Sequence, residues 1–311
     1  MIKYVYICSS RFSGSTLLGL LLGSHSQVAM VGELSHLPKN ISINNKCSCG
    51  VPVRSCNLWM KVIELLNKRF QIDLLKNPYK LNLGLINPSV LVDKVHKKRS
   101  YKFKRKILRG LKYLELRYGL FFFTPFLRHF DRVTENTFIV YDTIREILKV
   151  DIVVDTSKDY LNAICLYKKK PDNFRIIFLV RDGRGVFYSG LKRGYSLKNS
   201  IEVWKNYYLR SYNLFNKFIP ASHILHIKYE DLAIDPKKTL NIICKFLGIN
   251  FEENMLNFTN FIHHVANGND MRFNKNSKIK LDVSWKEKLS SEQKRYFENI
   301  AGGLNRQLGY V

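Results

Sequence analysis

Short apolar segments alternate with segments of helical periodicity along most of this 311-residue chain. The apolar segments have the composition of buried strands and span residues 3–10, 27–34, 151–159, 174–185 and 223–232. Helical spacing of apolar residues follows at 16–25, 161–170, 185–192, 201–218 and 236–248. Continuous apolar strands that alternate with helices are typical of a parallel sheet covered by helices on both faces. The pattern therefore predicts the α/β class and a single domain over residues 1–311.

The alternation is interrupted at about residues 60–150. This region has helical spacing and is strongly basic between residues 94 and 119. We interpret it as a basic helical insertion between the second and third strands of the sheet. After the last strand, a polar, turn-rich segment at 267–290 precedes a final helical segment.

The chain is very basic, with 51 Lys and Arg against 25 Asp and Glu and a formal net charge of +26. This favours polyanionic partners: nucleic acid, acidic lipid headgroups, sulfated glycans or a multiply charged nucleotide. Scattered lysines without a binding role are the other explanation. The first strand begins almost at residue 1 and no apolar segment is long enough to span a membrane, which predicts a cytoplasmic protein. The basic, aromatic-rich stretch 97–123 fits a helix on an anionic membrane surface, and equally a helix packed on the core.

A tight turn of serines and glycine follows the first strand at residues 9–16 and leads into an apolar helix. A strand–turn–helix junction binds anions because the first N–H groups of the helix are free and the helix dipole is positive there. Loops that bind nucleoside triphosphates carry a lysine directly after their second glycine. Here Ser15 follows Gly14, so the turn predicts an anion site but disfavours triphosphate hydrolysis.

Other polar residues lie where the remaining strands end. Glu33 follows the second strand, residues 155–158 the third, and Arg181 with Asp182 the fourth. Ligands of parallel sheets bind at the carboxyl ends of the strands. We therefore expect these side chains to share one edge of the sheet with the anion loop.

Together these features resemble the sulfotransferases that use 3′-phosphoadenosine-5′-phosphosulfate as donor. The resemblance rests on the Ser-Gly-Ser-Thr turn, on Glu33 and on the segment FLVRDGRGVFYSGLKR at 178–193. It is closest to bacterial members and to the tyrosylprotein and carbohydrate branches, and covers roughly 1–60, 150–250 and 265–310. It implies a parallel α/β fold related to phosphate-loop kinases, 3′,5′-bisphosphoadenosine as product, and a reaction that requires no metal.

The resemblance also implies where the donor binds. The residues that match the 5′-phosphosulfate loop of the family are Ser13, Gly14, Ser15 and Thr16. Arg181 and Ser189 match the pair that holds the 3′-phosphate, and their spacing allows a strand-end guanidinium and a helix hydroxyl to converge. Arg193 and Tyr229 match two further donor contacts.

Two residues match the catalytic groups of the tyrosylprotein branch. Glu33 matches the base that takes the acceptor proton, and Lys158 lies near the position of the lysine that faces the leaving oxygen. A bound anion beside Glu33 should raise its pKa. Each of these residues also has a structural interpretation, as a helix cap or an ion-pair partner.

The sequence departs from the family pattern in the anion loop. The arginine that commonly precedes the Ser-Gly pair is Phe12 here, and Arg11 is one place earlier, so we keep Arg11 as a candidate donor contact. The resemblance does not fix which residues of the C-terminal segment match the donor-binding loop of the family. Its candidates are Asn269, Arg272 and Lys280.

Three of the six cysteines, Cys47, Cys49 and Cys56, lie within ten residues. C-x-x-C pairs are absent and no fourth ligand is near in sequence, so free thiols or a disulfide are favoured over zinc, and we predict no metal site. The histidines at 25, 36, 263 and 264 are interpreted as structural or surface residues.

The predicted function is transfer of a sulfuryl group to an acceptor hydroxyl of a glycan, lipid or peptide. The reaction would be an in-line displacement like phosphoryl transfer. A small-molecule kinase would share the fold but should carry a loop lysine and depend on magnesium. A nucleic-acid-binding protein would explain the charge, but the sequence has no recognised nucleic-acid motif.

Overall fold

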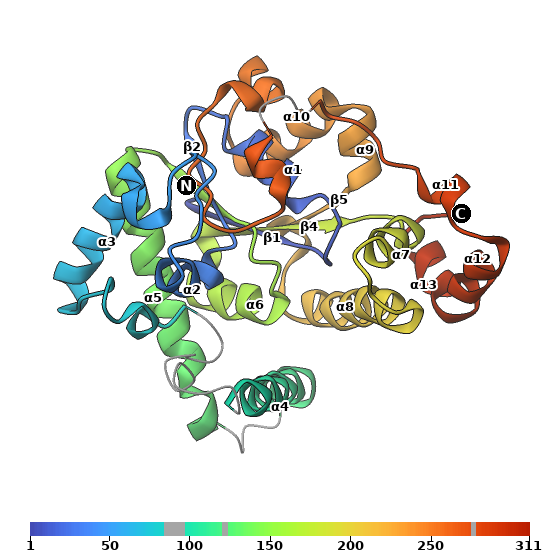
Figure 1. The fold of residues 1–311 in the computed structure, drawn as a ribbon, viewed down its shortest axis with the longest axis horizontal. Coiled ribbons are helices and arrows are strands. Elements are labelled where there is room, and N and C mark those ends of the chain that lie inside the picture. Colours follow the sequence, from blue (N-terminus) through green and yellow to red (C-terminus); the bar gives the residue numbers. More distant parts are fainter. Residues whose placement is uncertain (84–96, 120–123, 275–277) are drawn as a thin grey trace.

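The computed structural model describes residues 1–83, 97–119, 124–274 and 278–311. Its centre is a five-stranded sheet with the order β2-β3-β1-β4-β5, in which every pair of neighbouring strands is parallel (Figure 1). The strands are β1 (Tyr4–Cys8), β2 (Val28–Gly32), β3 (Ile152–Asp155), β4 (Phe174–Val180) and β5 (Ile224–Lys228). The predicted parallel sheet is therefore confirmed.

The middle strand is buried on both faces, as its unbroken apolar sequence requires. All five residues of β1 are buried, and Tyr4 pairs with Val153 on one side and with Phe174 on the other. Alternate side chains point to opposite faces of a strand. Val5 and Ile7 thus join one apolar core, whereas Tyr4 and its alternate neighbours join the other.

Helices cover both faces of the sheet (Figure 1). One face carries α1 (Ser15–Leu22), α9 (Tyr229–Ile234) and α10 (Pro236–Leu247). The opposite face carries α2 (Leu37–Ser42), α3 (Asn57–Phe70), α5 (Thr124–Leu148), α6 (Tyr160–Lys169) and α8 (Leu197–Phe218). The remaining helices, beside α8 and at the C-terminal end, are α7 (Gly183–Leu191), α11 (Trp285–Lys288), α12 (Ser291–Phe297) and α13 (Gly303–Gln307).

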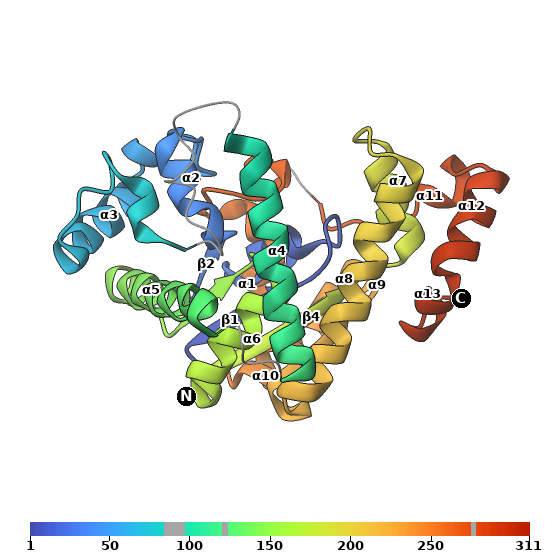
Figure 2. The same cartoon turned by 90° about the horizontal axis from the view of Figure 1, so that it is seen from below.

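The interrupting region is helical where the structure describes it. It comprises α3, α4 (Lys97–Tyr118) and α5, while residues 84–96 and 120–123 lie outside the described residues. Figure 2 shows α4 crossing the outside of the layer that holds α6 and α8. Lys217 of α8 donates hydrogen bonds to the carbonyls of Leu116 and Arg117, at 2.9 and 3.0 Å. In the described part of the chain, no helix is both long and apolar enough to cross a bilayer.

All five predicted strands extend past the observed carboxyl ends, including the last one. Residues 223–232 were expected to be extended, but β5 ends at Lys228, which pairs with Val180 at the end of β4. The next residues form α9, with Glu230 and Asp231 in its first turn. Acidic side chains stabilise the positive end of a helix, which explains why the chain turns into a helix here.

Asp155 ends β3 inside the protein. Its carboxylate accepts hydrogen bonds from the Tyr141 hydroxyl at 2.7 Å and from the backbone N–H of Ser157 at 2.6 Å. Burial nevertheless dominates and raises the pKa of Asp155 to about 6, since a buried carboxylate loses its hydration.

We therefore expect the ionised Asp155 to cost stability at neutral pH. The pKa of Asp155 is higher in the folded protein than in the unfolded chain, so the protonated carboxyl favours folding. This contribution to the free energy of unfolding is complete below the ordinary pKa of 3.8 and is lost as the pH rises to about 6. Asp155→Asn cannot titrate. The stability of the variant relative to the wild type should thus increase by up to about 3 kcal/mol between pH 4 and 7. Urea unfolding of both proteins across this range tests it, and parallel pH curves would contradict it.

Candidate functional site

The anion loop connects β1 to α1 in the middle of the sheet. Gly14 is the residue before α1 and has φ 87°, and no described side chain caps the helix. The first N–H groups of α1 are therefore free to bind an anion. A Cβ atom at position 14 would lie 2.5 Å from Cδ2 of Tyr229, so both the backbone angle and the close approach of this ring require glycine.

Buried hydroxyls hold the loop in place. Tyr208 donates to the carbonyl of Leu179 at 2.9 Å and lies 3.3 Å from the hydroxyl of Ser13. Thr16 accepts a hydrogen bond from the backbone N–H of Asn269 at 3.3 Å. The buried hydroxyl of Ser9 has no hydrogen-bond partner among the residues that the structure describes. A rigid turn with buried, partly unsatisfied hydroxyls suits a compact oxyanion.

Arg181 lies on the β4–β5 side of this loop. Its guanidinium donates to the carbonyl of Phe12 at 2.8 Å and to the carboxylate of Asp282 at 3.0 Å. Its Cζ atom lies 4.4 Å from the ring centroid of Tyr229. The predicted donor contacts Arg181, Tyr229 and Gly14 therefore lie together, and a buried guanidinium is fixed among them.

Ser189 and Arg193 lie next to this group, on and after α7. The Ser189 hydroxyl donates to the carbonyl of Gly185 at 2.8 Å, and an added Cβ at Gly185 would be 3.2 Å from Nε of Arg181. Arg193 donates to the Ser189 carbonyl at 3.4 Å and stacks on Phe12, with Cζ 4.4 Å from the ring centroid. Both arginines thus contact Phe12, one through its backbone and one through its ring.

Phe12 occupies the position where sulfotransferases commonly have arginine. It has a φ of 63°, which is unusual for a residue with a side chain. Its neighbour Arg11 is exposed and donates to the Tyr195 hydroxyl at 3.4 Å. The structure therefore places the Arg11 side chain at Tyr195, and Arg193 occupies the face of the Phe12 ring.

Glu33 and Lys158 lie on the opposite side of the loop, after β2 and β3. Their side chains form an ion pair in which both are mostly buried, with 19% and 17% of their surface exposed. The second carboxylate oxygen of Glu33 accepts a hydrogen bond from Asn267 at 3.0 Å and lies 3.8 Å from Nδ1 of His36. The two predicted catalytic residues are thus in direct contact.

Neighbouring cations dominate the electrostatics of Glu33 in this pair. Burial acts to raise the pKa of Glu33, but Lys158, with His36 and Arg11, outweighs it and lowers the pKa below its usual value. Lys158 itself has a φ of 67°, and its carbonyl accepts a hydrogen bond from Tyr207 at 2.8 Å. A strained backbone that is held by a partner is typical of functional positions.

The three C-terminal candidates lie in different places. Asn269 contacts the loop through its backbone N–H, as described above, and its side chain accepts from the N–H of Met271 at 3.0 Å. Arg272 donates to the carbonyl of Gly268 and stacks on Phe273. Lys280 has an exposed side chain, and its carbonyl accepts from the Tyr229 hydroxyl at 3.2 Å. Of these three described residues, Asn269 forms a hydrogen bond with the anion loop.

Sequence reasoning missed two residues that touch the candidate site. Asn267 binds the Glu33 carboxylate, and Asp282 forms an ion pair with Arg181. Both come from the polar stretch 267–290, whose register no local pattern fixes. Chain order alone could not identify them because their partners are more than 100 residues away.

Comparison with known proteins supports a single family. The model of the sulfotransferase family matches residues 126–253. No curated protein matches the sequence. The fold matches the sulfotransferase domain of the curacin biosynthetic pathway with a TM-score of 0.50 and 18% identity, covering 100% of this chain and 99% of that domain.

Two further structures are less similar. The sulfotransferase domain of the Synechococcus PCC 7002 olefin synthase has a TM-score of 0.47 and 19% identity, with 97% and 94% of the two chains covered. Mouse sulfotransferase SULT7A1, solved with PAP, has a TM-score of 0.37 and 17% identity, with 54% and 73% covered. The match of the sulfotransferase family model to residues 126–253 and the fold shared with the curacin-pathway domain confirm the predicted resemblance to bacterial sulfotransferases.

Proposed function

We propose that the protein transfers a sulfuryl group from 3′-phosphoadenosine-5′-phosphosulfate to an acceptor hydroxyl. One observation supports the proposal: in the strand order β2-β3-β1-β4-β5, the loop after β1 lies between two groups of charged side chains. Glu33 and Lys158 follow β2 and β3 on one side, and Arg181 follows β4 on the other. A nucleotide with its sulfuryl end at the lysine and its 3′-phosphate at the arginine would span this edge.

The residues of the loop would bind the 5′ end of the donor. The free N–H groups at the start of α1 and the hydroxyls of Ser15 and Thr16 are donors for sulfuryl and phosphoryl oxygens. Arg181, with Ser189 and Arg193 beside it, would hold the 3′-phosphate by charge-assisted hydrogen bonds.

Lys158 and Glu33 would exchange partners during the reaction. In the free protein Lys158 neutralises Glu33 and lowers its pKa, which makes the carboxylate a weak base. If Lys158 turns to the leaving bridging oxygen, Glu33 loses its main cationic partner and its pKa rises. The acceptor oxygen would then bond to sulfur as the bond from sulfur to the leaving oxygen breaks, while Glu33 takes the acceptor proton.

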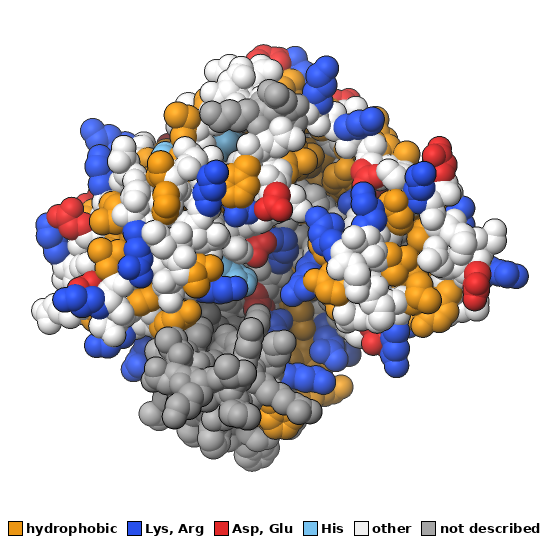
Figure 3. All heavy atoms as spheres, in the orientation of Figure 1, with side chains coloured by type: hydrophobic (Ala, Val, Ile, Leu, Met, Phe, Trp, Pro, Cys, Tyr) orange, Lys and Arg blue, Asp and Glu red, His pale blue; other side chains and the backbone are white. Residues whose placement is uncertain are grey.

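The rival functions predict different behaviour. A kinase at this site would need magnesium and a triphosphate, whereas Ser15 stands where the loop lysine would be. A nucleic-acid-binding protein should gather its basic residues in one stripe. On the face shown in Figure 3, Lys and Arg side chains are scattered among acidic and apolar ones. An acceptor screen with isotopically labelled donor, read by mass spectrometry, would identify the substrate class.

The first prediction concerns the 3′-phosphate. The protein should bind 3′,5′-bisphosphoadenosine without magnesium and much more tightly than AMP. Arg181→Ala should weaken this binding by roughly ten- to a hundredfold, because a charge-assisted hydrogen bond contributes about 1.5–3 kcal/mol. Asp282→Asn is the matched variant: it removes the carboxylate that competes for the guanidinium, so affinity should stay equal or increase. Calorimetry that shows equal affinity for AMP, or no effect of Arg181→Ala, would refute the assignment.

The second prediction concerns the base. Glu33→Gln keeps an acceptor for Asn267 but cannot take a proton, so kcat should fall by about 10²–10⁴-fold. Affinity for 3′,5′-bisphosphoadenosine should change little. Glu64→Gln, which alters an exposed glutamate paired with Lys68, is the control and should keep full turnover. Near-normal turnover of Glu33→Gln would exclude Glu33 as the base. A joint fall in turnover and nucleotide affinity would give it a structural role instead.

We also propose that α4 binds anionic membrane. Its exposed apolar residues Phe103, Ile107, Leu114 and Tyr118 are spaced by four, seven and four positions and so share one face of the helix. Exposed Lys106 and Arg117 flank this face. Such a stripe matches an interfacial helix, in which apolar side chains enter the headgroup boundary and cations bind anionic lipid.

Vesicle co-sedimentation tests whether the protein binds anionic membrane through α4. The protein should bind phosphatidylserine-containing vesicles at moderate salt and bind pure phosphatidylcholine poorly. The double substitution Phe103→Ser with Ile107→Ser should reduce binding roughly tenfold or more, because two apolar side chains no longer enter the lipid. Val203→Ser removes a similarly exposed side chain from α8 and should have no effect. Absence of binding to the anionic vesicles would contradict the proposal that α4 binds membrane.

A further inference from the structure

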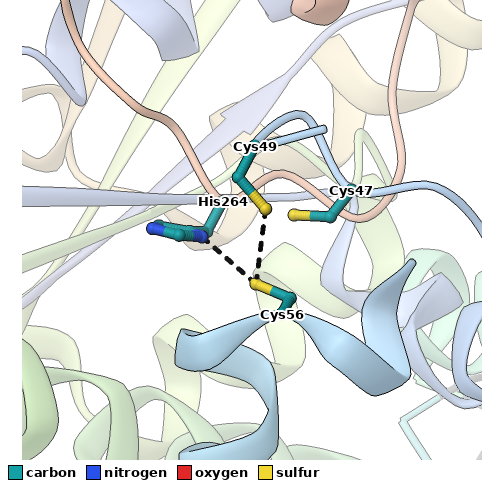
Figure 4. A group of neighbouring side chains, drawn as sticks. All are labelled: Cys47, Cys49, Cys56 and His264. Carbon is teal, nitrogen blue, oxygen red and sulfur yellow. Dashed lines mark hydrogen bonds between the residues drawn. The ribbon is translucent and has the colours of Figure 1, made fainter. Parts of the chain in front are cut away.

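Three cysteines and one histidine, distant in sequence, meet in one cluster. Figure 4 shows the side chains of Cys47, Cys49, Cys56 and His264 pointing toward a common centre. One potential ligand atom from each residue lies within 4.8 Å of every other. The thiols of Cys49 and Cys56 are 3.6 Å apart, and the Cys56 sulfur is 3.1 Å from Nδ1 of His264. Sequence reasoning found no fourth ligand because His264 is 208 positions after Cys56.

We propose that this cluster binds one zinc ion with a structural role. Three thiolates and an imidazole are a common ligand set of four-coordinate structural zinc. Bond lengths of about 2.3 Å to sulfur and 2.0–2.1 Å to nitrogen in a tetrahedron place the ligand atoms about 3.5–3.8 Å apart. The ligand atoms of the cluster are 3.1 and 3.6 Å apart in two pairs, and all lie within 4.8 Å of one another. Small shifts of the side chains would therefore bring the four atoms to tetrahedral distances. Soft sulfur ligands also disfavour magnesium and calcium.

Local hydrogen bonds fix the backbone around the thiols. A turn presents Cys47 and Cys49 on the same side: the N–H of Gly50 donates to the carbonyl of Cys47 at 3.0 Å, and Gly50 has φ 102°. Cys56 directly precedes α3, where the helix dipole stabilises a thiolate. The His264 carbonyl accepts a hydrogen bond from Nε1 of Trp59 in the first turn of that helix, at 3.0 Å.

Other uses of these thiols fit the geometry less well. A disulfide would engage two cysteines and leave the third with the histidine, and all six cysteines of the chain are free thiols in this structure. A cysteine–histidine pair could act as a nucleophile, but the Cys56 side chain is 0% exposed and no substrate could reach it. Burial of Cys47 and Cys56 together with convergence of four ligands favours a closed metal site.

The zinc site would fix a segment that contacts the anion loop and Glu33. The hydroxyl of Ser48 accepts a hydrogen bond from the backbone N–H of Val265 at 2.8 Å, and the backbone N–H of Ser48 donates to the carbonyl of Val265 at 3.1 Å. Two residues later, the carbonyl of Asn267 accepts from the N–H of Glu33, and its side chain donates to the Glu33 carboxylate. The metal would therefore join the 47–56 turn and the start of α3 to the segment that positions Glu33.

Metal analysis of the full-length protein is the direct test. Protein expressed with zinc in the medium and purified under reductant should contain about one zinc per chain that survives dialysis. X-ray absorption at the zinc edge should show three sulfur ligands and one nitrogen. Cobalt(II) taken up by metal-stripped protein should give the intense visible bands of a tetrahedral thiolate site. These measurements use the wild type and do not depend on transferase activity.

Variants assign the ligands. Cys49→Ser changes the most exposed of the three cysteine ligands, and together with His264→Ala it should weaken zinc binding by more than about a hundredfold, since even partners of ligands affect affinity ten- to a hundredfold. Cys165→Ser changes a cysteine outside the cluster and should retain zinc. Less than about a tenth of a zinc per wild-type chain after anaerobic reconstitution would overturn the proposal. So would a spectrum without sulfur ligands, or retention of zinc by the double variant.

Discussion

The parallel direction of all five strands is the constraint on which the candidate site depends. It brings every strand's carboxyl end to one edge, and the central place of β1 puts the anion loop in the middle of that edge. Glu33 and Lys158 then lie on one side and Arg181 with Tyr229 on the other, although these four residues follow four different strands. No single segment could offer both an anion cradle and two separate groups of charged residues.

The loop itself is held in a conformation that few sequences adopt. Phe12 and Gly14 both have positive φ, and the Tyr229 ring fills the space that a side chain at position 14 would need. Such angles persist only where the surroundings over-determine them. Here the buried Tyr208 hydroxyl contacts the Ser13 hydroxyl, and the Arg181 guanidinium donates to the carbonyl of Phe12. The packing that stabilises the fold therefore also pre-organises the N–H groups for an anion.

The sequence could predict the sheet and the strand-end residues because both depend on local patterns. Continuous apolar segments identify buried parallel strands, and a polar residue after each strand must lie at the shared edge. What it could not predict are contacts made by the irregular C-terminal stretch. Asn267, Asp282 and His264 contact Glu33, Arg181 and Cys56 across more than 100 positions of sequence, and no periodicity marks them. The pairing of Glu33 with Lys158 was similarly invisible, so the lowered pKa of Glu33 could not be foreseen.

Two cations of the site, Lys158 and Arg181, are each paired with a carboxylate. Lys158 is paired with Glu33, and Arg181 with Asp282, whose side chain is 45% exposed. Buried cations without partners would be costly, so these pairs keep the free site stable. An arriving anion would exchange one anionic partner for another at each cation, which limits the net electrostatic gain but favours ligands with two correctly spaced negative groups. Under the proposed function, a donor with a 3′-phosphate and a 5′-phosphosulfate would satisfy both exchanges at once, whereas a nucleotide with one phosphate would satisfy only one. Selectivity for the proposed donor would then follow from the internal neutralisation of the site as much as from the individual contacts.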